Sequence, residues 1–216
     1  MEIPIFPLNT VLFPGATLPL HIFEERYKQM IAQCLEDQHS FGVVLIRSGG
    51  EVGATAEPFD IGAIANISNV ERLDDGKMNL ICRGGERFRI VKTIADTPYL
   101  KAEVELIETA TESDPATTDL ADEATTLFAE YTRLYLAVTN QWSRTIDLPG
   151  DPQTLGDFIG SRLPVAPRTK QKLLEELSAA TRLDMEKRLL GAAIRQMTSQ
   201  VRTARDARWH GLAVMN

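Results

Sequence analysis

Cysteine and histidine are scarce in this sequence, which holds two of the first and three of the second. His21, His39 and His210 lie in separate segments, so no short spacing brings them together as metal ligands. Cys34 and Cys82 belong to no paired motif, and we expect two buried thiols in a reducing cytoplasm in preference to a disulfide. These absences exclude the common metal signatures and predict a protein without a metal or other cofactor.

Long apolar runs and targeting signals are missing as well. No window approaches the roughly 18 apolar residues that a membrane-spanning helix requires. The first 14 residues carry Glu2 and three prolines, with neither a basic start nor an uninterrupted apolar core, and this pattern excludes a signal peptide. We therefore expect a cytoplasmic protein with no membrane partner.

Positive charge is not in excess. The 216 residues carry a net charge of −7, and the pI is near 5.1, which does not favour nucleic acid or an acidic membrane as a partner. Residues 102–132 hold nine acids and no Lys or Arg, whereas the last helical segment is rich in arginine, beginning with Arg182. Solvated faces are the favoured interpretation, and a docking surface for an acidic partner is the alternative.

The nucleotide and nucleophile motifs fail at their defining positions. The only Gly-Lys pair, Gly76-Lys77, lacks the hydroxyl residue and the first glycine of a Walker loop, because Met78 and Glu71 stand there. Ser161 lacks the flanking glycine of a nucleophile elbow, and no pair of carboxylates stands out. We predict no catalytic, cofactor-binding or metal-binding residue and a chain that is not an enzyme. The residues of any binding surface are not defined by the sequence.

Other polar features have structural interpretations. His21 stands in an apolar stretch, so we expect a hydrogen-bonded structural residue, with a catalytic base as the alternative. Glu24 and Glu25 suit the first turn of a helix, where the helix dipole favours acids. The glycine-rich run 49–53 is not followed by a helical pattern and predicts a turn between strands.

Short strands and one early helix are predicted for the first half. Four prolines interrupt residues 3–22, which predicts one or two short strands that bend sharply. A helix over 23–35 follows, since its apolar residues recur at three- and four-residue spacing. Further strands are expected over 41–46, 62–70, 78–82, 88–94 and 100–107, with an Asp-Asp-Gly hairpin turn at 74–76. Such a set predicts a closed or nearly closed barrel.

The second half has a helical period. The polar stretch 108–119 is the expected boundary, and helices are expected over 119–138, 151–163, 168–178 and from 181 past 201. A capping box is expected at Thr181–Asp184, and the inward stripe of the last helix is expected to consist of Met185, Leu189, Ala193, Met197 and Val201. The fold class is therefore α+β, with a β-rich pseudo-barrel domain over 1–110 and a helical bundle domain over 111–216.

A basic cluster lies on one predicted strand and comprises Arg83, Arg87, Arg89 and Lys92. Strand alternation places Arg87 and Arg89 on one face and Phe88 on the other, which separates charge from a stacking ring. An ordinary half-buried strand is favoured, and an RNA-binding strand is the alternative.

The opening segment, residues 3–27, resembles the start of the amino-terminal domain of Lon proteases. The likeness continues through 41–46, 59–70, the Asp-Asp-Gly turn, 80–90 and the helical stretch 155–177. The chain is identified on these motifs as a member of the Lon amino-terminal (substrate-binding) domain family. The matched residues of the opening fit structural roles and locate no binding surface; they are Pro7, Leu8, Phe13, Pro14, Gly15, Pro19 and Leu20.

The resemblance implies a PUA-like pseudo-barrel followed by a helical bundle that ends in a long helix. In Lon this domain binds polypeptide substrates and does no chemistry, while ATP hydrolysis and proteolysis occur in later domains. Because the sequence ends at Asn216 without those domains, the resemblance implies a free-standing member.

Two classes of function follow. The leading hypothesis is a non-catalytic module that binds unfolded or apolar polypeptide segments, with a protease or a chaperone as further candidate partners. The alternative is an RNA-binding protein that uses the PUA-like barrel, although the net charge argues against it. An enzymatic role has the least support, since it needs a pocket of convergent ionisable groups that the sequence does not show.

Overall fold

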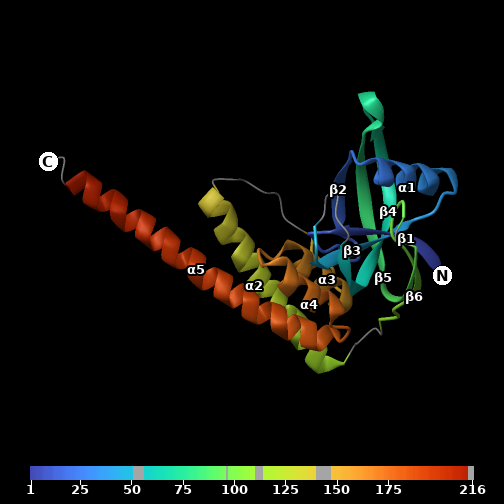
Figure 1. Ribbon diagram of the computed structural model, residues 1–216. Helices are drawn as coiled ribbons and strands as arrows, with labels where there is room; N and C mark the ends of the chain where they lie inside the picture. Colours follow the sequence, from blue (N-terminus) through green and yellow to red (C-terminus); the bar gives the residue numbers. More distant parts are fainter. Residues whose placement is uncertain (51–55, 96, 110–113, 140–146, 214–216) are drawn as a thin grey trace. The chain divides into compact units, whose positions relative to one another are not determined.

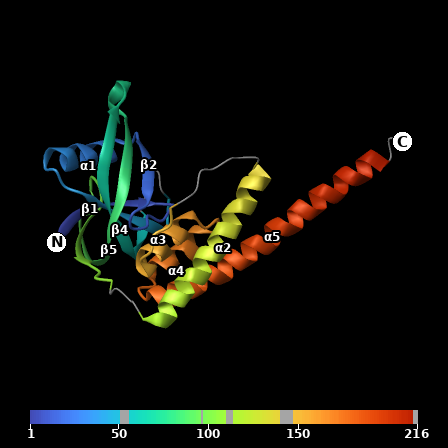
Figure 2. The same ribbon diagram turned by 180° about the vertical axis from the view of Figure 1, so that it is seen from behind.

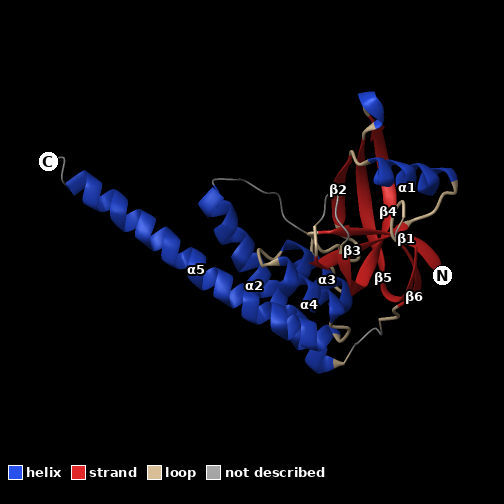
Figure 3. Cartoon of the chain, viewed as in Figure 1, coloured by secondary structure: helices blue, strands red, loops and turns tan. Residues whose placement is uncertain are grey.

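The computed structural model describes residues 1–50, 56–95, 97–109, 114–139 and 147–213, and the side chains of the last helix as far as residue 199 (Figures 1 and 3). In chain order the elements are β1 (Glu2–Leu8), β2 (Thr17–Ile22), α1 (Glu25–Glu36), β3 (Phe41–Ser48), β4 (Glu57–Arg72), β5 (Met78–Ala95), β6 (Lys101–Leu106), α2 (Pro115–Thr139), α3 (Pro152–Arg162), α4 (Pro167–Glu175) and α5 (Ala179–Ala213).

The chain divides into two compact units. The first comprises Met1–Ala110 with Gly160–Leu177, and the second comprises Thr111–Ile159 with Ser178–Asn216. Helix α4 packs against β4 in the first unit, where the Gln171 side chain donates to the Ile61 carbonyl at 2.9 Å. The division of the sequence at residue 110 stays a prediction about separately folding domains.

The strands of the first unit form the expected pseudo-barrel. Their order is β2-β5-β4-β3-β1-β6, and β6 also pairs with β5, so β1, β3, β4, β5 and β6 close into a ring. The pairing of β1 with β3 is parallel, and the other pairings are antiparallel. Closure satisfies the strand edges within the ring. Strand β2 lies outside the ring, and in the described part of the chain it pairs only with β5.

The expectation of separate strands at 78–82 and 88–94 was wrong, because β5 runs unbroken from Met78 to Ala95. Gly84 lies in its middle and bonds to the turn before β2: Gly84 N donates to Ala16 O at 2.8 Å, and Gly15 N donates to Gly84 O at 2.8 Å. A side chain at Gly84 would place its Cβ 2.0 Å from the Phe13 carbonyl oxygen. The glycine therefore allows close backbone approach instead of ending the strand. Figure 2 shows β4 and β5 running side by side to their connecting turn.

Helix α1 carries the expected buried face. Tyr27, Met30, Ile31 and Cys34 are buried, and the Tyr27 ring stacks on Phe6 of β1 with centroids 4.0 Å apart. The predicted start at Phe23 was wrong by two residues. Phe23 precedes the helix and is 47% exposed.

Aspartate caps determine where two helices of the second unit begin. The expected cap at Asp151 is confirmed, since its carboxylate accepts from Thr154 N at 2.8 Å. The same Asp-Pro signal starts α2 at Pro115, earlier than the predicted 119, and Asp114 accepts from Thr117 N at 3.1 Å. The hydrogen bonds from Thr117 hold the pKa of the Asp114 carboxyl below its ordinary value.

Helix α5 departs from two predictions. It begins at Ala179, where the Ser178 hydroxyl accepts from Thr181 N at 3.3 Å, so the capping box at Thr181 was wrong. Its buried positions are offset from the predicted stripe, whose described members (Met185, Leu189, Ala193 and Met197) are only half-buried. The buried residues are instead Ala179, Arg182, Leu183, Glu186 and Leu190. The side chain of Val201 lies outside the described residues.

The burial of Arg182 corrects the prediction that it lies on a solvated face. Its side chain is 0% exposed, and its Nη2 donates to the Gln153 carbonyl at 2.8 Å. The same atom lies 3.7 Å from the Asp157 carboxylate, which is also buried. A Cβ at Gly156 would stand 2.7 Å from Arg182 Nε, so the glycine makes room for the guanidinium. No described helix combines the length and apolar character needed to cross a membrane.

Candidate functional site

Both cysteines are buried and free, as predicted. The pKa of each thiol is raised to about 11, mainly by burial, and at Cys34 nearby Asp37 contributes to the rise. The thiols are protonated at neutral pH, which makes them poor nucleophiles and metal ligands. Among the described residues, no three His, Cys, Asp or Glu side chains gather closely enough to hold a metal ion.

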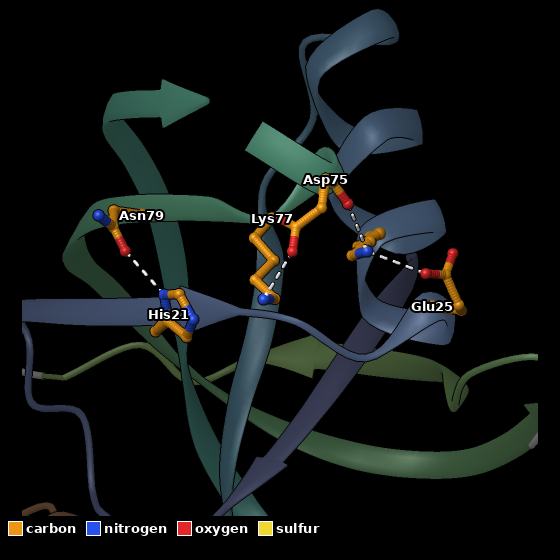
Figure 4. A network of polar contacts seen from close by, with 6 residues as sticks. His21, Glu25, Asp75, Lys77 and Asn79 are labelled. Atoms are coloured by element: carbon orange, nitrogen blue, oxygen red, sulfur yellow. Dashed lines mark hydrogen bonds and ion pairs between the residues drawn. The ribbon is translucent and has the colours of Figure 1, made fainter. Parts of the chain in front are cut away.

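His21 makes the expected hydrogen bond. Its Nδ1 lies 2.8 Å from Asn79 Oδ1 (Figure 4), and outside that view Asn79 Nδ2 donates to Glu71 at 2.9 Å. The imidazole thus ties β2 to β5, although it is exposed and not enclosed by the apolar residues around it in sequence. The ring also faces Phe23, with centroids 5.9 Å apart. His39 is exposed, and the side chain of His210 lies outside the described residues.

The Asp-Asp-Gly turn is the expected hairpin connection between β4 and β5. Lys28 of α1 donates both to the Asp75 carbonyl at 3.2 Å and to Glu25 at 2.9 Å (Figure 4). Lys77 pairs with Asp75 at 2.7 Å, and this hydrogen bond holds the pKa of Asp75 below its ordinary value. Lys77 therefore stabilises the turn through its ion pair with Asp75. Of the run 49–53, Gly49 follows β3 with φ +94°, and residues 51–53 lie outside the described residues.

The basic cluster on β5 is divided by burial. Arg87 is buried and donates through Nε to the Leu174 carbonyl at 2.9 Å, whereas Arg89 is exposed. Residues 87–89 pair with 63–61 in regular register, as the predicted alternation requires, so Arg87 is buried because Leu174 of α4 lies against it. Arg89 and Lys92 stand opposite Glu105 and Glu103 of β6, and opposite charges at paired positions favour the sheet.

A first concave surface lies beside β2, and we call it the β2 groove. Its volume is about 290 Å³, and its lining is mainly apolar, from Phe6, Leu8, Thr10, Leu18, Pro19, Leu20, His21, Ile22, Phe23, Glu24 and Tyr27. The stacked rings of Phe6 and Tyr27 belong to it. It thus combines an edge strand, apolar walls and the exposed ring of Phe23.

A second and larger concavity lies at the carboxyl end of α1, and we call it the α1-end cavity. Its volume is about 630 Å³. It is lined by Met1, Glu2, Ile3, Pro4, Gln33, Cys34, Asp37, Gln38, His39, Ser40, Ile64, Asn66, Glu86, Tyr99, Lys101 and Leu106. In contrast to the β2 groove, it carries charges of both signs. The sequence motifs pointed to neither concavity.

A five-strand ring with one early helix and a following helical unit defines a PUA-like pseudo-barrel protein with a helical extension. The family profile described as the substrate-binding domain of ATP-dependent protease La (Lon) matches residues 2–191. The chain belongs to this family.

Curated relatives of the chain are named as Lon proteases. Lon protease 2 of Myxococcus xanthus is 28% identical over 191 residues, which cover 87% of this chain and 23% of that protein. The Lon protease of Paraburkholderia phytofirmans is 31% identical over 180 residues, which cover 82% of this chain and 22% of that protein. The chain thus spans less than a quarter of the length of these two relatives.

Solved structures show the same fold. A Lon N-terminal domain protein from Xanthomonas campestris superposes with a TM-score of 0.65 at 28% identity, covering 86% of this chain and 96% of that one. The N-terminal domain of the Mycobacterium avium complex Lon protease superposes with a TM-score of 0.66 at 21% identity, and the match covers 88% of this chain and 98% of that one. The chain is therefore a Lon N-terminal-like module.

Proposed function

We propose that the chain is a non-catalytic polypeptide-binding module whose β2 groove takes unfolded or apolar segments of other proteins. The observation that carries this proposal is the exposed ring of Phe23 at an apolar groove beside an edge strand. Phe23 is 47% exposed next to apolar walls, and covering it with a second apolar surface lowers the free energy.

The edge strand supports an extended ligand. An extended peptide can add to a sheet edge through main-chain hydrogen bonds, while alternate side chains enter neighbouring pockets. Strand β2 pairs with β5 along one of its two edges. Leu18 and Leu20 of β2 are half-buried and line the groove. A polypeptide with apolar residues at alternate positions therefore matches both features.

The family relation supports the same proposal. The matched part of the relatives is the part described as substrate-binding, and it is less than a quarter of each protein. Polypeptide capture without chemistry, in the cytoplasm and in concert with a protease or chaperone, is consistent with that match. The burial of Arg87 leaves the RNA-binding alternative with a smaller exposed basic cluster.

Replacing Phe23 with serine should weaken peptide binding about tenfold, since central aromatic anchors contribute about 1.4 kcal/mol or more. The measurement is fluorescence anisotropy with a labelled peptide of alternating Leu and Ser, about 10 residues long. Val91→Ser is the matched control, because Val91 is 51% exposed on β5 but does not line the groove.

If both variants and the unaltered protein bind the peptide with equal affinity, the peptide binds outside the β2 groove. Absence of peptide binding by the unaltered protein, together with RNA affinity that falls steeply with salt, would favour the RNA alternative.

A further inference from the structure

We propose that the α1-end cavity is a second subsite, which takes a basic side chain, Lys or Arg, of a polypeptide. This inference rests on the proposed function, since the ligand is again a polypeptide segment. It adds a charge preference that the apolar β2 groove does not supply.

The cavity has the size and composition of a ligand site. Its volume of about 630 Å³ falls in the usual range for small-ligand and peptide pockets. Ile64, Tyr99 and Leu106 provide apolar walls, and Leu106 is 46% exposed. Polar groups of the segment that joins α1 to β3, and of the strands around it, complete the lining, so an occupant with both an apolar and a polar portion fits best.

The charges of the lining favour a cation. Three carboxylates (Glu2, Asp37 and Glu86) line the cavity, and the basic groups of the lining are the Lys101 ammonium, the His39 imidazole and the amino group of Met1, which donates to Val104 O at 2.8 Å. Among the described residues, neither Glu2 nor Glu86 has an ion-pair partner, and Asp37 accepts one hydrogen bond, from Gln33 Nε2 at 2.7 Å. The three carboxylates outnumber the two amino groups, so the balance remains negative.

The end of α1 adds to this negative balance. The last helical turn holds no basic residue, and Asp37 stands at the C-cap. The carboxyl end of a helix carries a partial negative charge, which a cation stabilises and an anion does not. A Lys or Arg ligand would supply the charge that the last turn lacks.

A basic side chain matches the cavity better than other occupants. Lys and Arg present an apolar stem and a charged head, which correspond to the apolar walls and the carboxylates. An apolar occupant would cover the carboxylates without compensation, and an acidic one would be repelled. The Nζ atom of Lys101 lies 5.2 Å from the centre of the Tyr99 ring. Asp37 raises the pKa of the Cys34 thiol and Lys101 lowers it, so both charges lie near this thiol.

This arrangement predicts opposite effects for two kinds of substitution. Asp37→Lys or Glu86→Lys should weaken binding of an arginine-containing Leu–Ser peptide about fivefold, whereas Lys101→Met should strengthen it about fivefold, each equal to about 1 kcal/mol. Affinity for the same peptide with glutamine in place of arginine should change little. The measurement is fluorescence anisotropy at two salt concentrations.

Glu36→Lys is the matched control. Glu36 is exposed at the same helix end, but it does not line the cavity. Its replacement with lysine changes the charge by the same amount as Asp37→Lys. Its effect on the arginine peptide should be small. Competition by free arginine amide tests whether a small cation alone suffices, and it should require far higher concentrations than the peptide.

The outcomes separate the two proposals. The subsite is refuted if the arginine and glutamine peptides bind equally, if Glu36→Lys acts like Asp37→Lys, or if free arginine amide binds as tightly as the peptide. If Phe23→Ser still weakens binding of the Leu–Ser peptide in those cases, the proposed function is supported without the subsite. If no peptide binds the unaltered protein, both proposals fall.

Discussion

Replacing Arg182 with methionine should lower the free energy of unfolding by about 3–5 kcal/mol. The guanidinium is fully buried beside the buried carboxylate of Asp157 and donates to the Gln153 carbonyl. Methionine fills similar space but leaves the carboxylate desolvated without its cation. The loss should appear as a lower denaturant midpoint of the helical unit.

A pair on the same helix provides the control. Arg188 pairs with Asp184 at 2.5 Å, but its side chain is 79% exposed, so Arg188→Met should cost less than about 1 kcal/mol. Replacing both Arg182 and Asp157 with apolar residues should recover part of the lost stability, because the buried Asp157 carboxylate is then no longer left without its cation. A midpoint for Arg182→Met equal to that of Arg188→Met would contradict this account of the buried pair.

Replacing Gly84 with alanine should also be strongly destabilising, by about 1–3 kcal/mol. The added Cβ would meet the Phe13 carbonyl oxygen at 2.0 Å, and a backbone oxygen cannot swing aside as a flexible side chain can. The two hydrogen bonds that join Gly84 to Gly15 and Ala16 would be strained as well. Since this turn leads into β2, peptide binding at the β2 groove should weaken too.

Gly150→Ala is the control for this substitution, because nothing lies within 4 Å of a Cβ at that position. Thermal unfolding followed by circular dichroism measures both variants. A melting temperature for Gly84→Ala at or above that of Gly150→Ala would show that the 13–16 turn can shift away from β5 without cost.

Local signals in the sequence were sufficient for much of the fold. The apolar run 41–46, the Asp-Asp-Gly turn and the spacing of Tyr27, Met30, Ile31 and Cys34 each depend on neighbouring residues, and each prediction from them was confirmed. The Asp-Pro cap predicted α3, and the same signal at Asp114 could have located the start of α2.

Long-range packing decided the remainder. A buried arginine is rare, and the room for Arg182 comes from Gly156, which lies on a different helix. The break expected between residues 82 and 88 was wrong because the backbone partner of Gly84, the turn at 13–16, is distant in sequence. The α1-end cavity gathers residues from distant parts of the first unit, so the order of residues along the chain could not reveal it. The β2 groove is lined by residues 6–27 alone, and only the fold of this segment shows that it forms a concave surface. The exposed ring of Phe23 became informative only once the helix was seen to begin at Glu25.

The measurement that tests the central claim most directly is photo-crosslinking of an apolar peptide, followed by mass spectrometry to identify the labelled residues. A peptide of alternating Leu and Ser with one photoreactive side chain should label β2 and Phe23, and Phe23→Ser should lose most of that labelling while Val91→Ser keeps it. Labelling concentrated instead on exposed apolar residues of α2, such as Tyr135 and Val138, would contradict the proposal that the β2 groove binds polypeptides.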